Sequence, residues 1–477
     1  MKKVCLSLFT LLVALFGIAQ KQIQKANGQY ISPKDIEGSV NDLMKAGDVN
    51  GIAIAMINDN VPSYIKAFGY SNAEKGIPLD TASAMYAASL AKPLFAYIVM
   101  QLVDKGFIAL DKPLYTYLQK PLPEYKAYAD LAGDERWKLI TARHCLTHTT
   151  GFPNWRQLNP NNNNKLEIFF TPGSRYAYSG EGLYLLQMVV EAITGKHLET
   201  LAQEQIFEPF GMYNTSFVWQ PSFEKNYAVG HNMNGDTLAK FRNKESNAAG
   251  SMETTVADYA RFLSAVLQHK GLSEQSWKEM FSRQIGIFTR HQFPSLNNDT
   301  TSANRSIQLS YGLGWGLFNT PYGSAFFKEG HGDGWVHYTI CLPDKKSALL
   351  IMSNSANGES IFKDLVDKLE GVSIPWEWEG YYPYRKHVTL SEFELKKFVG
   401  QYKNERMRAI VTLDKGVLKV EVPDMGLGKT NLYAESDHHF FMKTMEVDLE
   451  FSIDDDGVSE KILVKDEGEE YELRRVK

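Results

Sequence analysis

The amino-acid sequence predicts an α+β fold: an antiparallel sheet with flanking helices, followed by a small all-β domain. Strand-like apolar runs occur near the beginning of the chain, at 51–57 and 63–68, and return late, at 334–341 and 347–352. Helical patterns fill the sequence between these groups, so the first and last segments are expected to pair in one sheet. From about residue 391 to 477, apolar and polar residues alternate, which is typical of half-buried strands.

Three stretches between the two groups of strands have the apolar spacing of helices. They run from Ser89 to Lys105, from Gly182 to Thr194 and from Thr255 to Leu267. The clearest change of pattern comes later, in an aromatic, proline-broken stretch. We expect residues 20–375 to form the larger domain, 376–390 an aromatic linker and 391–477 the small antiparallel β domain.

Residues 1–19 have the pattern of a secretory signal peptide. Lys2 and Lys3 give it a positive start, an apolar run follows, and Gly17-Ile18-Ala19 forms a small-x-small cleavage site. The apolar run is too short for a membrane helix and polar residues follow at once. We therefore expect an exported protein, periplasmic or extracellular, with no membrane span after the signal is removed.

The net charge limits the kinds of molecule that the protein binds, and the surroundings of the cysteines indicate the state of their thiols. Loss of the signal changes the formal net charge from -5 to -7, because the segment carries two lysines and no acid. This mild acidity argues against nucleic acid as a partner and leaves a small molecule or peptide as substrate. Cys145 and Cys341 lie in apolar surroundings, which predicts buried thiols, although a disulfide between them stays open.

The chain's most informative motif is Ser89-Leu90-Ala91-Lys92, at the start of the first predicted helix. Residues three apart share a helix face, so the Ser89 hydroxyl and the Lys92 amine can meet. The apolar continuation buries the helix, and burial lowers the pKa of a lysine until it can accept a proton from a serine. The alternative is that Ser89 only caps the helix and Lys92 extends to solvent.

Two later stretches carry further polar groups. In Tyr178-Ser179-Gly180-Glu181, a tyrosine held near a lysine can shuttle protons, although a structural core tyrosine is the commoner case. In the segment 330–337, glycines allow a substrate close to the backbone, and His331 can hold a carboxylate.

Metal binding is a competing interpretation of the histidines. It would use either His331, Asp333 and His337, or His144 and His148. Neither set forms a dense ligand cluster, and the second lacks the glutamate of a His-Glu-x-x-His motif. We therefore predict no metal.

The order Ser-x-x-Lys, Tyr-Ser-x and His-Gly-x before a late strand resembles the serine β-lactamase and penicillin-binding superfamily. It is most similar to the class C β-lactamase-related group of DD-peptidases and esterases. Supporting stretches lie within residues 45–355, at 86–92, 143–151, 211–215, 249–254 and 311–315. The resemblance implies a sheet with a helical lobe and hydrolysis through an acyl-enzyme without a cofactor. The C-terminal region is similar to small barrel-like domains appended to some members.

Carried onto this sequence, the resemblance makes Ser89 the acylated nucleophile and Lys92 its proton acceptor. Tyr178 would relay the proton to the leaving group, and His331 would take the place where relatives carry Lys or His before a small residue and Gly. The oxyanion hole would combine the Ser89 N–H with an N–H of the late strand, with Gly334 as the candidate.

Two departures from the family pattern affect the predicted substrate-binding residues. Relatives have Asn two residues after the tyrosine, where it is expected to hold an acylamide side chain; here Gly180 stands there, followed by Glu181, whose charge would repel a carboxylate. Asp333 follows Gly332 where a glycine is usual, which leaves the alignment of Gly334 open.

The function predicted from sequence is an exported serine hydrolase that forms an acyl-enzyme on Ser89 and cleaves an ester, a small amide or a D-amino-acid peptide. The alternatives are a β-lactamase or D-alanyl-D-alanine carboxypeptidase proper, and a non-catalytic protein that binds penicillin or a partner.

Overall fold

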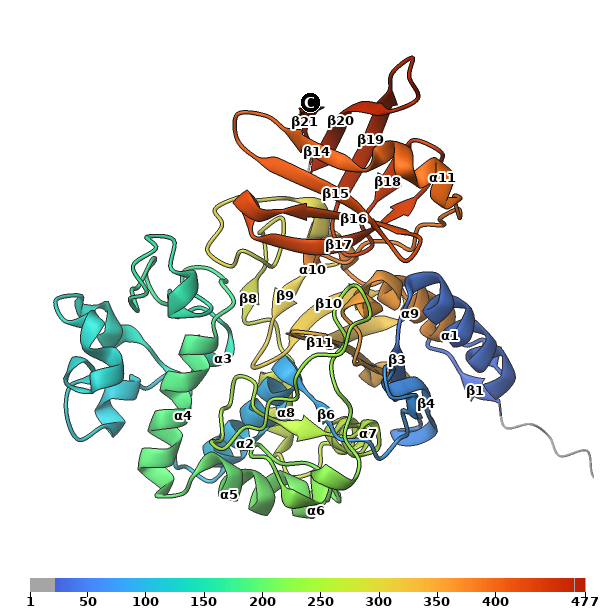
Figure 1. Cartoon of the computed structure of the whole chain (residues 1–477). Coiled ribbons are helices and arrows are strands. Elements are labelled where there is room, and N and C mark those ends of the chain that lie inside the picture. Colours follow the sequence, from blue (N-terminus) through green and yellow to red (C-terminus); the bar gives the residue numbers. More distant parts are fainter. Residues whose placement is uncertain (1–21, 467, 477) are drawn as a thin grey trace, which may run out of the picture.

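A nine-stranded antiparallel sheet forms the centre of the larger domain (Figure 1). The computed structural model describes residues 22–466 and 468–476, so the predicted signal peptide at 1–19 lies outside the described residues. The first and last segments pair through β3 and β13, which confirms the predicted α+β class. The strand order is β5 (Ile77–Pro78), β4 (Val61–Asn72), β3 (Gly51–Asn58), β13 (Ser347–Ser353), β12 (Trp335–Leu342), β11 (Gly323–Gly332), β10 (Gly316–Thr320), β9 (Ser310–Tyr311) and β8 (Ile285–Gly286).

The sheet separates two hydrophobic cores. Successive side chains of a strand point to opposite faces, and on β3 the buried Ile54 and Ala55 belong to different cores. The core of Ile54 is covered by α1 (Pro33–Gly47) and α9 (Phe362–Glu370). The core of Ala55 is covered by the helical lobe.

The helical lobe contains the three predicted helices with small shifts at their starts. The first is a 3-10 turn, Ala88–Leu90, that leads into α2 (Ala91–Asp104). The second begins earlier than predicted because the Ser179 hydroxyl caps it by accepting from the Gly182 N–H at 3.1 Å. The helices of the lobe are α2, α3 (Ala142–Leu146), α4 (Gly180–Thr194), α5 (Leu198–Ala202), α6 (Glu208–Phe210), α7 (Val256–Leu267) and α8 (Glu274–Met280).

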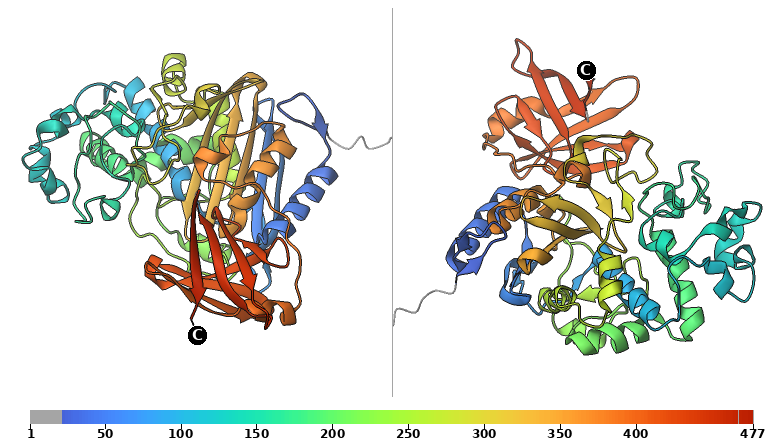
Figure 2. Two further views of the ribbon diagram at one scale, coloured as in Figure 1. Left: turned by 90° about the horizontal axis from the view of Figure 1, so that it is seen from above. Right: turned by 180° about the vertical axis from the view of Figure 1, so that it is seen from behind.

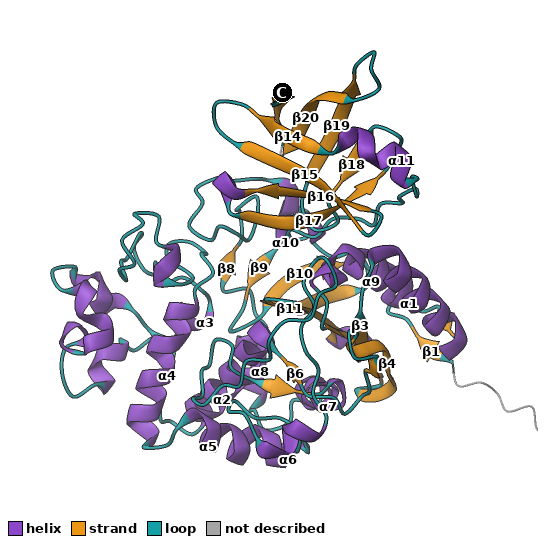
Figure 3. Ribbon diagram, in the orientation of Figure 1, coloured by secondary structure: helices purple, strands orange, loops and turns teal. Residues whose placement is uncertain are grey.

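The C-terminal part closes into an eight-stranded barrel with its own core, and Figure 3 shows it as almost entirely strand. Alternate residues of β19, such as Val447, Leu449 and Phe451, fill that core as the alternation predicts. The strands are β14 (Gly400–Lys403), β15 (Arg408–Asp414), β16 (Val417–Val422), β17 (Leu427–Ala434), β18 (His439–Phe441), β19 (Val447–Ile453), β20 (Ser459–Asp466) and β21 (Glu469–Arg475). A short helix, α11 (Glu392–Leu395), precedes them.

The barrel lies above the sheet of the larger domain in the front view (Figure 1) and in the rear view (Figure 2, right). The Asn234 side chain binds the backbone of β17 at two points, donating to the Lys429 carbonyl at 2.6 Å and accepting from the Asn431 N–H at 3.1 Å. Lys443 of the barrel lies 2.6 Å from Asp48 at the end of α1. Over the described ranges, no helix is long and apolar enough to cross a bilayer.

The aromatic stretch after residue 375 packs on the larger domain. Its start forms one helical turn, α10 (Trp376–Glu379), and both Trp378 and Tyr381 are buried in the core beneath α9. The Trp378 indole donates to the Thr289 hydroxyl at 3.1 Å. We propose that the structural boundary between the domains lies after Tyr381, within the predicted linker 376–390.

The buried tryptophan gives a stability prediction. Trp378→Ala will lower the free energy of unfolding by about 3–5 kcal/mol, because it leaves a large cavity in a close-packed core. The measurement is the urea unfolding midpoint. Phe393→Ala is the matched control, since Phe393 is an aromatic residue of the C-terminal part that is 77% exposed, and it should change the free energy by less than about 0.5 kcal/mol. Equal effects of the two changes would contradict the packing role.

Two short ladders and the cysteines complete the fold. β1 (Ile23–Gln24) pairs with β2 (Tyr30–Ile31), and β6 (Met85–Tyr86) pairs with β7 (Glu253–Thr254). Cys145 and Cys341 are both buried free thiols, so they do not form the disulfide that the sequence left open.

Candidate active site

The segment that carries Ser89 is held in a fixed and strained conformation. β6 precedes it and is tied to β7, and Ala88 then adopts a positive φ of 46°. Left-handed backbone costs an alanine roughly 1–2 kcal/mol, so the surrounding packing must hold it. Ser89 follows in the 3-10 turn at the start of α2, and its side chain borders the open cleft.

Lys92 lies next to this serine and away from water. Its Nζ is 2.8 Å from the Ser89 Oγ and donates to the Ala249 carbonyl at 2.6 Å, and the residue is 1% exposed. Burial lowers the pKa of Lys92 well below its usual value; the charge of Lys328 lowers it further and Glu329 opposes this. Because burial disfavours its charged form, the Lys92 amine can accept the serine proton.

Tyr178 lies across from the pair, with its ring centroid 5.1 Å from the Lys92 Nζ. The neighbouring Ser179 fixes the backbone beside Tyr178. The Ser179 N–H donates to the His148 Nδ1 at 3.1 Å, and the Ser179 hydroxyl donates to the Pro153 carbonyl at 2.8 Å. The His148 ring also packs on the Tyr178 ring at 4.2 Å. Burial raises the pKa of Tyr178, while Lys328 and the Ser89 hydroxyl act to lower it.

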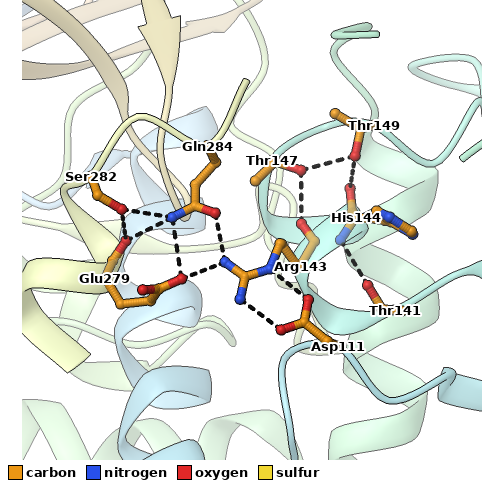
Figure 4. A network of polar contacts seen from close by, with 9 residues as sticks. All are labelled: Asp111, Thr141, Arg143, His144, Thr147, Thr149, Glu279, Ser282 and Gln284. Carbon is orange, nitrogen blue, oxygen red and sulfur yellow. Dashed lines mark hydrogen bonds and ion pairs between the residues drawn. The ribbon is translucent and has the colours of Figure 1, made fainter. Parts of the chain in front are cut away.

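A polar network centred on Arg143 anchors the segment that leads to His148 (Figure 4). Its guanidinium binds Asp111 at 2.6 Å and Glu279 at 2.5 Å, and so joins the segment that follows α2 to the end of α8. The Thr147 hydroxyl donates back to the Arg143 carbonyl at 2.8 Å. The network thus positions His148, and through it the backbone beside Tyr178.

A second buried lysine belongs to this group and was missed by the sequence reasoning. Lys328 on β11 is fully buried, and its Nζ lies 4.9 Å from the Tyr178 ring centroid. Its Nζ is 2.5 Å from Glu329, which also accepts from the Gln292 amide at 2.7 Å. Burial is the largest single influence and lowers the pKa of Lys328, but the charge of Glu329, the interaction with Tyr178 and the hydrogen bonds to both together outweigh it and raise the pKa. Lys328 therefore stays charged next to the phenol.

The structure does not bring the His331 imidazole into this group. Lys328 pairs with Thr339 and His331 with Val336 along β12, so the two side chains lie on opposite faces of the sheet. The His331 Nε2 lies 2.7 Å from Glu359. Burial raises the pKa of Glu359 to about 8 and lowers that of His331. The basic group beside Lys92 and Tyr178 is Lys328 instead.

Glycines allow β11 to run against the nucleophile segment. A Cβ on Gly330 would lie 3.1 Å from the Ala87 carbonyl, and one on Gly332 would lie 2.7 Å from the Tyr86 ring. Gly334 instead sits in the following turn with a φ of 75°, packed against Gly230. The late-strand backbone nearest Ser89 is thus 330–332 and not Gly334.

Gly180 and Glu181, the two residues that depart from the family pattern after Tyr178, each contact a residue of the loop at 155–156. A Cβ on Gly180 would overlap the Trp155 ring, so the space that a side chain at 180 would use is filled by Trp155. Glu181 is buried and bound by Arg156, with contacts of 3.0 and 2.8 Å to its two carboxylate oxygens. This corrects the expectation that the Glu181 charge acts on the substrate, because Arg156 neutralises it.

The cleft beside Ser89 has a volume of about 670 Å³. Aromatic side chains form much of its wall: Tyr86, Trp155, Tyr184, Phe241 and Trp335. Asp333 from the β11–β12 turn also borders it.

The histidines offered as metal ligands lie in separate surroundings. The His144 ring lies beside Gly173, whereas His148 packs on Tyr178. The His337 Nε2 contacts the Tyr86 carbonyl at 2.8 Å. Within the residues that the structure describes, no group of three or more His, Cys, Asp or Glu side chains could hold a metal ion.

A serine next to a buried lysine, at the start of a helix that packs against an antiparallel sheet, is the arrangement of a serine hydrolase. The profile of the Beta-lactamase family matches residues 36–370, and the chain belongs to that family.

Individual relatives agree with this family at low identity. Penicillin-binding protein 4* of Bacillus subtilis (strain 168) is 24% identical over 463 residues, which cover 89% of this chain and 95% of the relative. Esterase EstB of Burkholderia gladioli is 30% identical over 179 residues, which cover 32% of this chain and 44% of the esterase. The solved structure of the octameric penicillin-binding protein homologue from Pyrococcus abyssi shares the fold, with a TM-score of 0.58 and 20% identity over 93% of this chain and 100% of that one.

Proposed function

We propose that this protein is an exported hydrolase that cleaves a neutral ester, or a small amide or D-amino-acid peptide, through an acyl-enzyme on Ser89. The observation that carries the proposal is the buried Lys92 Nζ at 2.8 Å from the Ser89 Oγ, at the edge of an open cleft. The pattern of residues 1–19 supports export.

The reaction has two halves that use the same groups. In the first, the Ser89 Oγ attacks the substrate carbonyl while the neutral Lys92 amine takes its proton, and Tyr178 passes a proton to the leaving alcohol or amine. In the second, water attacks the acyl-enzyme and gives its proton to the Tyr178 phenolate, while Lys92 returns its proton to the Ser89 Oγ as the ester bond breaks. We assign the oxyanion contacts to the N–H of Ser89 and to one N–H from 330–332, and the support of the Tyr178 phenolate to Lys328.

The cleft favours a neutral substrate over a carboxylate. The two basic residues that border it are each paired with an acid: Lys240 lies 2.7 Å from Glu253, and His331 lies 2.7 Å from Glu359. Neither offers an unpaired positive charge to a substrate carboxylate. β-Lactams and peptides that end in D-alanine carry such a carboxylate, so they are expected to be poorer substrates than esters.

The test is hydrolysis of p-nitrophenyl acetate by the mature protein, with Ser89→Ala as the control. We expect turnover that Ser89→Ala abolishes, and labelling of Ser89 by a fluorophosphonate. Parallel assays with a D-alanyl-D-alanine peptide and a penicillin rank the substrate classes. Labelling by fluorophosphonate or penicillin without turnover of any ester, amide or lactam would refute the proposal and indicate a non-catalytic binding protein.

A further inference from the structure

The place after Tyr178 that would read an amide is occupied by an aromatic ring. Gly180 leaves room for Trp155, and any side chain at 180 would collide with that ring. The Trp155 ring centroid is 5.9 Å from the Lys92 Nζ, so the ring reaches the immediate surroundings of the reacting atoms. Trp155 also borders the open cleft. The glycine and the tryptophan therefore form one unit beside the nucleophile.

A second ring extends this surface. Tyr184, one turn into α4, lies 5.5 Å from Trp155 between ring centroids, with an angle of 39° between the rings. The Asn247 amide donates to the Tyr184 hydroxyl at 2.5 Å and its carbonyl accepts from the Ala249 N–H at 2.8 Å. These contacts hold Tyr184 and Asn247 in place and use the Asn247 carbonyl and one N–H of its amide, and both Trp155 and Tyr184 line the cleft.

We propose that Trp155 and Tyr184 form a subsite for an apolar, preferably aromatic, acyl group, so that the natural substrate is a neutral ester of an arylacetic or similar acid. This inference rests on the proposed ester hydrolysis at Ser89 and names its substrate class. An aromatic acyl group buries apolar area on both rings and gains a stacking contribution. An acylamide side chain finds no amide at 180. Gly180 acts as a positioning residue for Trp155.

The experiment compares p-nitrophenyl phenylacetate with p-nitrophenyl acetate, which share a leaving group and differ only in the acyl part. We expect the wild-type ratio of kcat/KM to favour phenylacetate. Trp155→Ala should lower this ratio by about tenfold or more, whereas Trp155→Phe retains most of it because a ring remains. Leu158→Ala, an exposed apolar residue of the same loop, is the matched control and should leave the ratio unchanged. An unchanged ratio in Trp155→Ala overturns the inference.

The role of Gly180 is tested by a double-mutant cycle. Gly180→Ala should also lower the phenylacetate preference, because its methyl group displaces Trp155. In the Trp155→Ala background the same change should have no further effect on the ratio. An equal loss in both backgrounds would show that Gly180 acts on the substrate by another route and would remove it from the unit.

A binding assay separates this inference from the proposed function. Methyl phenylacetate is added to Ser89→Ala and its contact with the protein is measured by saturation-transfer NMR, with methyl acetate as the reference. If no ester is turned over but methyl phenylacetate binds, and Trp155→Ala removes the binding, the subsite stands and the hydrolytic proposal falls. If esters are hydrolysed without preference and methyl phenylacetate does not bind, the subsite falls and hydrolysis stands.

Discussion

Lys92→Met is expected to lower ester turnover, and the labelling of Ser89 by fluorophosphonate, by about 10²–10⁴-fold. The change removes the base that lies 2.8 Å from the Ser89 Oγ. A methionine side chain of similar length fits the apolar surroundings, so the fold is expected to persist, and the urea unfolding midpoint serves as the control for folding. Labelling at the wild-type rate in a folded Lys92→Met protein would contradict the role of Lys92.

The pH dependence of the wild-type enzyme follows from the same residue. Lys92 accepts a proton only as the neutral amine, and burial shifts its pKa well below the usual value for lysine. The rate should therefore be highest above this pKa and fall as the pH is lowered through it, in kcat/KM measured for a slow ester. A profile with no acidic limb down to the pH of unfolding would rule out Lys92 as the base.

The sequence predicted the parts of the site that depend on local spacing. Ser89 and Lys92 are one helical turn apart, so the helix alone brings their side chains together. The sheet was predictable for a similar reason, because apolar runs with turns between them mark strands wherever they occur. The strands β8 to β10 could not be predicted in this way. Two of them, β8 and β9, are only two residues long and therefore show no apolar run.

The sequence did not distinguish His331 from Lys328. Both precede a glycine closely, as Lys328-Glu329-Gly330 and His331-Gly332, so each fits a basic residue followed by glycine. Only the pairing of β11 with β12 decides which one faces Ser89, and a shift of an odd number of residues reverses the face. This register depends on contacts between strands and is invisible to a motif.

The residue that fills the space of the missing asparagine could not be predicted from the sequence either. The sequence revealed that Gly180 removes an amide, but the ring that fills its place comes from Trp155, in a loop with no helical or strand pattern. Arg156 in the same loop neutralises Glu181. Trp155 thus packs against Gly180, and Arg156 forms an ion pair with Glu181. Both contacts join segments that are distant in the sequence, so only the tertiary structure reveals them.

The buried pair of Lys328 and Glu329 leads to the second large effect. Lys328→Met should lower the free energy of unfolding by about 3–5 kcal/mol, because it leaves the Glu329 carboxylate buried without its cation. The double variant Lys328→Met/Glu329→Gln should recover most of that loss, since a neutral amide at 329 can still accept from Gln292 and carries no charge. The urea unfolding midpoint measures both.

Ester turnover should respond differently from stability. Lys328 lowers the pKa of Tyr178, so without it the phenol resists deprotonation and the proton transfer to the leaving group slows. Both the single and the double variant should therefore lose activity, while only the double variant regains stability. Recovery of turnover together with stability in the double variant would mean that Lys328 serves the fold alone. If the double variant is stable but still has low turnover, the loss of activity comes from the missing positive charge next to Tyr178 and not from a loss of packing.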